Sequence, residues 1–105
     1  MRRVYLIKES DLPRDLSNAA NFGDLVVCLT KRESNLSNGM VLNRLRSTLR
    51  DYGEGDYVLY AGGEWSAIML TGVVLKELGV RHIDLLVWRK INKAEGGYIP
   101  QRIVL

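Results

Sequence analysis

Three apolar runs of strand length, separated by two segments with helical periodicity, limit the possible folds of this chain more than any other feature. The runs are Asp24–Lys31, Tyr57–Ala61 and Ile83–Arg89. Their nearly continuous apolar character is typical of strands that are covered on both faces. Because strand–helix–strand crossovers are almost always right-handed and give parallel neighbours, we expect these three strands to be parallel.

The two segments between these runs have the residue spacing of helices. In Gly39–Tyr52 the apolar residues recur on one face, and arginines and other polar residues occupy the opposite face. Ser37 or Asn38 is the expected N-terminal cap of this helix. Glu64–Leu78 is apolar over most of its circumference, and Gly79 is expected to end it. The sequence therefore predicts two main helices.

A further strand is predicted near the N-terminus. The segment Arg3–Glu9 alternates in the manner of a strand. Val4 and Leu6 lie on one face of the predicted strand, and Tyr5 and Ile7 lie on the other. Lys8 shares the face of Val4 and Leu6.

The last pattern, Tyr98–Leu105, follows a turn at Asn92–Gly97 and is expected to run antiparallel to the preceding strand. Pro100 cannot donate a ladder hydrogen bond, which predicts an edge strand. The predicted fold class is a small α/β sandwich with a mixed, partly parallel sheet of about five strands and two main helices. Residues 10–23 are rich in turn and capping residues, and both a short helix and an irregular loop are compatible with them.

The length and the composition bound the kind of protein. At 105 residues the chain is expected to form a single domain over residues 1–105. Its longest apolar stretch is too short to span a bilayer, and its N-terminal apolar run is shorter than a signal peptide requires, so we expect a cytoplasmic protein. Cys28 is the only cysteine, which excludes a disulfide within the chain and a cysteine-based zinc site. No metal and no other cofactor is expected.

The glycine pair after the run at Tyr57–Ala61 lies where open parallel sheets bind ligands, beyond the carboxyl ends of the strands and near a helix N-terminus. The chain has neither a P-loop nor a dinucleotide-binding motif, and Glu64 would repel a phosphate. A purely structural turn is therefore the alternative, and it is the commoner use of two adjacent glycines. If the edge does hold a ligand, a nucleotide or another phosphorylated molecule fits its four cations and glycine pair, which are Lys31, Arg32, Gly62, Gly63, Arg89 and Lys90.

The sequence contains no recognisable set of catalytic residues. His82 is the only histidine, and it is expected at the opposite end of the sheet from the glycine pair. Cys28 lies inside an apolar run, where a thiol is usually an inert core residue. Glu33 and Glu64 could reach the glycine pair, but they lie beside cations that would pair with them. These observations favour a binding protein over an enzyme, although an enzyme without a known motif stays open.

A second apolar stripe on the second predicted helix points to a partner. Met69, Leu70 and Val73 lie on the side where a monomer would carry polar residues. Residues 10–23 could cover this stripe, and so could a second copy of the chain. The apolar tail Ile103–Leu105 on an edge strand offers another route to pairing. The expected partners are therefore a homo-oligomer or another protein.

The first predicted helix has a basic outer face, formed by Arg44, Arg46 and Arg50. A solvated surface explains such a face without any ligand, and the net charge of +3 is modest. Weak nucleic-acid binding stays open as a minor alternative. It would appear as an affinity that falls steeply with salt concentration.

The second half of the chain resembles small uncharacterised proteins of tailed bacteriophages. The resemblance rests on YVLYAGGEW running into an apolar helix, then LLVWRK, and then GYIPQRIVL. It covers residues 56–105, with a weaker similarity in the opening VYLIKES. The resemblance implies a small accessory protein that binds a partner. It implies no assigned activity, cofactor or catalytic residue.

Overall fold

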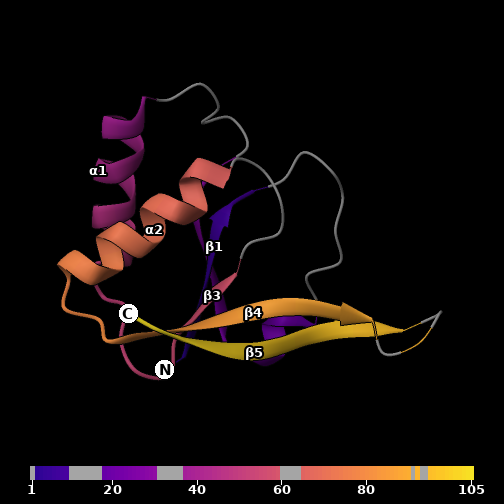
Figure 1. Ribbon diagram of the computed structural model, residues 1–105. Helices are drawn as coiled ribbons and strands as arrows, with labels where there is room; N and C mark the ends of the chain where they lie inside the picture. The colour runs from indigo at the N-terminus through magenta and orange to yellow at the C-terminus, as the bar shows by residue number, and fades with distance from the viewer. Residues whose placement is uncertain (1, 10–17, 31–36, 60–64, 91, 93–94) are drawn as a thin grey trace.

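The computed structural model describes residues 2–9, 18–30, 37–59, 65–90, 92 and 95–105. In these residues the chain forms one five-stranded sheet, and both α-helices pack against the same face of it (Figure 1). The predicted small α/β fold with a mixed sheet and two helices is confirmed. The elements in chain order are β1 (Arg3–Lys8), the short 3-10 helix η1 (Ala19–Asn21), β2 (Asp24–Leu29), α1 (Asn38–Leu49), β3 (Tyr57–Leu59), α2 (Trp65–Glu77), β4 (His82–Lys90) and β5 (Gly96–Val104).

The strands are arranged in the order β2-β1-β3-β4-β5. The first four are parallel, and β5 runs antiparallel to β4. The edge position of β5, which was predicted from Pro100, is confirmed. The inner position of β1 was not predicted. Val4 of β1 pairs with Leu25 of β2 on one side and with Tyr57 of β3 on the other.

Right-handed crossovers explain which face each connection occupies. From β2 to β3 and from β3 to β4 the chain moves toward β5, so α1 and α2 lie on the same face. From β1 to β2 the chain moves in the opposite direction, and the same rule then predicts the other face for η1, the described helix between them. Accordingly, Ala19 of η1 packs with Val4 and Leu6 in a second apolar cluster on the face away from the helices.

The main core lies between the sheet and the two helices. Tyr5 and Ile7 of β1 face it, whereas Val4 and Leu6 face the second cluster, so the predicted division of β1 into two faces is confirmed. Each fully buried apolar side chain of this size stabilises the fold by about 1.5–3 kcal/mol. In the described part of the chain, neither helix has the length and apolar character needed to cross a membrane. The helix residues of the core are Val41, Leu45 and Leu49 of α1 with Ala67, Val74 and Leu75 of α2.

Local signals set the ends of both helices. The Ser37 hydroxyl accepts a hydrogen bond of 3.3 Å from the backbone N–H of Met40, which confirms Ser37 as the cap of α1. After α2, Gly79 has a φ of 82° in the left-handed region, and the N–H of Val80 reaches back to the carbonyl of Leu75 at 3.0 Å. This stop leaves Leu78 outside the helix and 42% exposed, so α2 ends at Glu77, one residue before the predicted end.

The β4–β5 hairpin reaches beyond the other strands (Figure 1). In the described part of the chain, β3 spans Tyr57–Leu59 and pairs with Leu85 and Leu86 of β4. Beyond Leu86, the end of β4 up to Lys90 pairs with β5 and with no other described strand. The end of β4 projects as a two-stranded ribbon.

Candidate functional site

The strand order creates a reversal of direction between β1 and β3. The chain leaves β1 toward one edge of the sheet and leaves β3 toward the other. In open parallel sheets ligands bind outside the carboxyl ends of the strands at such a reversal. Four of the six residues predicted to bind a ligand at this edge lie outside the described residues, namely Lys31, Arg32, Gly62 and Gly63. The structure describes the other two, Arg89 and Lys90.

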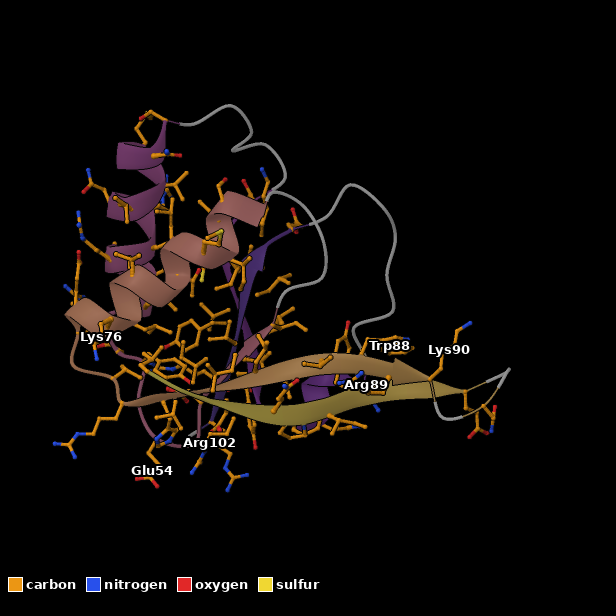
Figure 2. The ribbon with its side chains drawn as sticks, viewed as in Figure 1. Glu54, Lys76, Trp88, Arg89, Lys90 and Arg102 are labelled. Carbon is orange, nitrogen blue, oxygen red and sulfur yellow. The ribbon has the colours of Figure 1, made fainter. Side chains whose placement is uncertain are left out.

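Arg89 and Lys90 are exposed at the end of β4 (Figure 2). Because they are successive residues of a strand, their side chains lie on opposite faces of the hairpin. Their neighbours across the ladder are Gly97 and Gly96, which carry no side chain to cover them. The two cations are therefore accessible, but they do not form one pair on a single face.

Trp88 lies on the same face of the hairpin as Lys90, and half of its surface is exposed (Figure 2). Its ring meets Tyr98 edge to face, with the ring centres 5.1 Å apart. A Cβ atom on Gly96 would lie only 2.6 Å from the Trp88 ring, so this glycine allows the indole to lie across the ribbon. Trp88 was not among the predicted site residues.

Lys8 is a further cation at the reversal, and it was not among the residues predicted to bind a ligand. It ends β1 and is only 8% exposed. Its position in the strand puts its side chain on the same face as Val4 and Leu6, away from the helices. Lys8 therefore does not share a face with Arg89.

A separate hollow of about 260 Å³ lies at the opposite end of the sheet. The turn after α1 and the start of β4 line it, and His82 is among its residues, at the end of the sheet where it was predicted. The hollow itself was not predicted, because its walls come together only when β3 pairs with β4. In Figure 2, Glu54 and Arg102 mark this end of the sheet, far from Trp88. The residues lining the hollow are Tyr52, Gly53, Glu54, Val80, Arg81, His82 and Asp84.

Two polar groups of this hollow are bonded within the fold. The Tyr52 hydroxyl donates to the carbonyl of Asp56 at 3.2 Å and accepts from the N–H of Asp84 at 3.3 Å. Burial is the main cause of a raised pKa of Tyr52, so its phenol stays neutral. The Asp84 carboxylate binds the guanidinium of Arg102, with Nε 3.0 Å from Oδ1. Tyr52 and Asp84 therefore brace the fold at this site.

The predicted interaction surface on α2 is exposed in part. Met69 is 73% exposed, and Val73, one turn further along, is also exposed. Leu70 is half-buried and packs against the main core. Residues 18–23, the described part of segment 10–23, are associated with the opposite face of the sheet and do not cover this side of α2. Residues 10–17 lie outside the described residues.

The basic face of α1 is tied to α2. Nε and Nη2 of Arg46 donate to the two carboxylate oxygens of Glu77, at 3.0 and 3.1 Å. These hydrogen bonds are the main cause of a raised pKa of Arg46 and a lowered pKa of Glu77. Arg46 is thus engaged in a bidentate pair, which weakens the case for α1 as an anion-binding face.

Cys28 lies in the core, where burial raises the pKa of its thiol to about 12. A thiol in this state is not a nucleophile near neutral pH. Within the described ranges, no group of three or more histidine, cysteine or acidic residues is placed to hold a metal ion.

A family model described as Phage Pam3 gp32-like protein matches residues 2–104. No curated protein matches the chain. Nor does any solved structure match it. The predicted resemblance to small phage proteins is confirmed, and it extends over almost the whole chain instead of residues 56–105 alone.

Proposed function

The chain belongs to the Phage Pam3 gp32-like protein family, and we propose that this small phage protein acts without catalysis, as an accessory protein that associates with a second copy of itself. The observation that carries the proposal is the exposure of large apolar side chains. Met69 on α2 is 73% exposed and Val104 on β5 is 79% exposed. Apolar surface of this kind is typical of interaction sites. The cytoplasmic location expected from the sequence remains part of the proposal.

The charge of the chain supports a second copy as the partner. The formal net charge is only +3, so two copies repel each other weakly. The end of β5 exposes apolar side chains on both of its faces, with Ile103 on one and Val104 on the other. A second copy supplies a matching apolar surface to cover them.

Sedimentation velocity over a range of protein concentrations tests this proposal. We expect the mean mass to rise from monomer toward an oligomer as the concentration approaches high micromolar. A chain that stays monomeric throughout this range would contradict the proposal. Added salt should not dissociate the oligomer, because its contacts are apolar rather than ionic.

A second candidate function is the binding of a nucleotide or another phosphorylated ligand. It is favoured by the reversal between β1 and β3 and by the exposure of Arg89 and Lys90 at the same edge. The proposed site also includes Lys31, Arg32, Gly62 and Gly63.

A thermal-shift screen against nucleotides and sugar phosphates tests this second candidate. A ligand at about a hundred times its dissociation constant adds about 2.7 kcal/mol of stability, which raises the melting temperature by several degrees. Arg89→Ala should remove the shift and leave the melting temperature of the free protein unchanged. Arg81→Ala, at the opposite end of the sheet, is the matched control and should keep the shift. An unaltered shift in Arg89→Ala would reject the site.

A further inference from the structure

Among the described residues no strand pairs with the outer edge of β5. The register of the hairpin shows which backbone groups of β5 point outward. Leu105 donates its N–H to the carbonyl of Arg81 at 2.9 Å, so its backbone faces β4. In an antiparallel pair the direction alternates from one residue to the next. The N–H groups of Tyr98, Arg102 and Val104 therefore point away from β4, and so do the C=O groups of these three residues and of Pro100.

The first half of this edge is protected against pairing. The N–H of Tyr98 is taken by the side chain of Asn18, whose Oδ1 accepts it at 2.8 Å. Pro100 has no N–H to offer to another strand. The ladder with β4 loses no hydrogen bond, because an N–H at this position would point outward. Proline and a covering side chain are common ways to prevent unwanted pairing at a sheet edge.

The second half of the edge has no such protection within the described residues. Arg102 and Val104 keep their outward N–H groups, and no described strand pairs with them. Ile103 between them is 40% exposed. The structure thus closes one half of the strand to pairing and leaves the other half open.

The charged side chain at the open half is turned away from the edge. The guanidinium of Arg102 binds both carboxylate oxygens of Asp84, its neighbour on β4, at 3.0 and 3.3 Å. The arginine therefore reaches back over β4 instead of outward. Its charge is balanced, so it does not guard the edge as an exposed lysine would.

We propose that the open half of β5 pairs antiparallel with the same half of a second copy, about a two-fold axis at Ile103. This inference rests on the proposed self-association and names its surface. The axis places Arg102 opposite Val104 of the second copy, and Val104 opposite Arg102 of the second copy. Both positions point their backbone groups outward, so the two pairs form four N–H···O=C bonds. The two sheets then join into one.

The side chain at the axis fits this arrangement. Ile103 meets Ile103 of the second copy at a position without backbone hydrogen bonds, where side chains of paired strands come closest. If the axis lay at Arg102 instead, the two copies of Arg102 would lie opposite each other and Pro100 would lie opposite Val104 of the second copy. That register is weaker, because Pro100 has no N–H to donate to the second copy. The open half of β5 is therefore complementary to itself in the register centred on Ile103.

A pair of charge variants tests the axis directly. Ile103→Lys and Ile103→Glu each place like charges opposite one another, so each variant alone should be monomeric at concentrations where the unchanged chain associates. A mixture of the two should form a one-to-one heterodimer, which native mass spectrometry distinguishes by mass. Circular dichroism of each variant checks that the exposed substitution leaves the fold intact.

A second pair of variants tests the backbone bonds. Val104→Pro removes an outward N–H without breaking a bond to β4, as Pro100 does, and should abolish the dimer. Val104→Thr keeps the N–H and the β-branched shape, and should retain it. Ser47→Lys, on the exposed face of α1, is the surface control and should also retain the dimer. Met69→Lys tests the alternative interface on α2.

The outcomes separate this inference from the proposed function. A dimer that is lost in Ile103→Lys, Ile103→Glu and Val104→Pro and restored in the mixture supports the two-fold pairing. If the unchanged chain is monomeric at high micromolar concentration, self-association itself is rejected. If the unchanged chain associates and the Ile103 variants do so equally, only the β5 interface is rejected. Loss of association in Met69→Lys alone would then assign the interface to α2.

Discussion

The backbone N–H of Arg3 donates a hydrogen bond of 2.9 Å to Oδ1 of Asp56, a residue 53 positions further along the chain. The other carboxylate oxygen of Asp56 accepts the N–H of Gly53 at 3.0 Å. Asp56 is only 6% exposed. One buried carboxylate thus ties the turn before β3 to the start of β1.

Asp56→Ala should cost about 3 kcal/mol of unfolding free energy. Hydrogen bonds to charged groups contribute about 1.5–3 kcal/mol each, and the substitution leaves two backbone donors without their acceptor. Urea denaturation followed by circular dichroism measures the loss. Asp51→Ala, an exposed acid in the same turn, is the control and should change stability by less than about 0.5 kcal/mol. A loss below about 1 kcal/mol in Asp56→Ala would contradict this role.

Leu45→Ala should destabilise the protein by about 2–5 kcal/mol, because it opens a cavity in the main core. Leu45 has no exposed surface and packs in the cluster formed by α1, α2 and the sheet. Met69→Ala provides the comparison, since its exposed side chain should contribute less than about 0.5 kcal/mol to monomer stability. The two midpoints in urea, measured at low protein concentration, give the difference. Equal midpoints would show that the core is packed differently.

The Arg46–Glu77 pair should make stability depend on pH in the acid range. The pKa of Glu77 is lowered from its ordinary value of 4.5, mainly by the hydrogen bond from Arg46. The stabilisation is therefore fully present above 4.5 and is lost as the pH falls through the lowered folded-state pKa. Because both side chains are exposed, we expect a small effect.

Urea midpoints of the unchanged chain and of Glu77→Gln test this dependence. The gap between them should be present at neutral pH and should close in acid. Arg46→Gln is the matched control, and it should remove the same pH-dependent part. A gap that widens in acid would reverse the sign and reject the assignment.

Cys28 should not react with thiol reagents in the folded protein. Its burial and its pKa of about 12 leave almost no thiolate near neutral pH. A chromogenic disulfide reagent should therefore label the native chain only as fast as it unfolds, and should label it completely in denaturant. Rapid labelling of the native chain would show that the thiol is accessible.

The elements and their faces could be predicted because their signals are local. Helical spacing placed Val41 and Leu45 on the buried face of α1, and the missing donor of Pro100 placed β5 at an edge. The same local rules put Arg89 and Lys90 at the end of β4. The sequence could also have predicted that these two cations lie on opposite faces, because successive residues of a strand alternate between its faces.

The place of β1 between β2 and β3 could not be predicted, because this pairing depends on contacts between segments far apart in the sequence. The alternation in β1 shows two apolar faces but not that β2 and β3 flank it. The hollow beside His82 was missed for the same reason. To predict the open half of β5 one must know the register of the hairpin, and the apolar run Ile103–Leu105 does not give that register. The glycine pair Gly62 and Gly63 lies outside the described residues, and its role stays a prediction.

The inner position of β1 has a consequence for the order in which the sheet is assembled during synthesis. β1 leaves the ribosome before the other strands, yet its second neighbour begins only at Tyr57. The β4–β5 ladder, by contrast, joins segments that are adjacent in the chain, so its loop closes at little entropic cost. We therefore expect the hairpin at the edge to form early and the centre of the sheet to be completed late, around the strand that was made first.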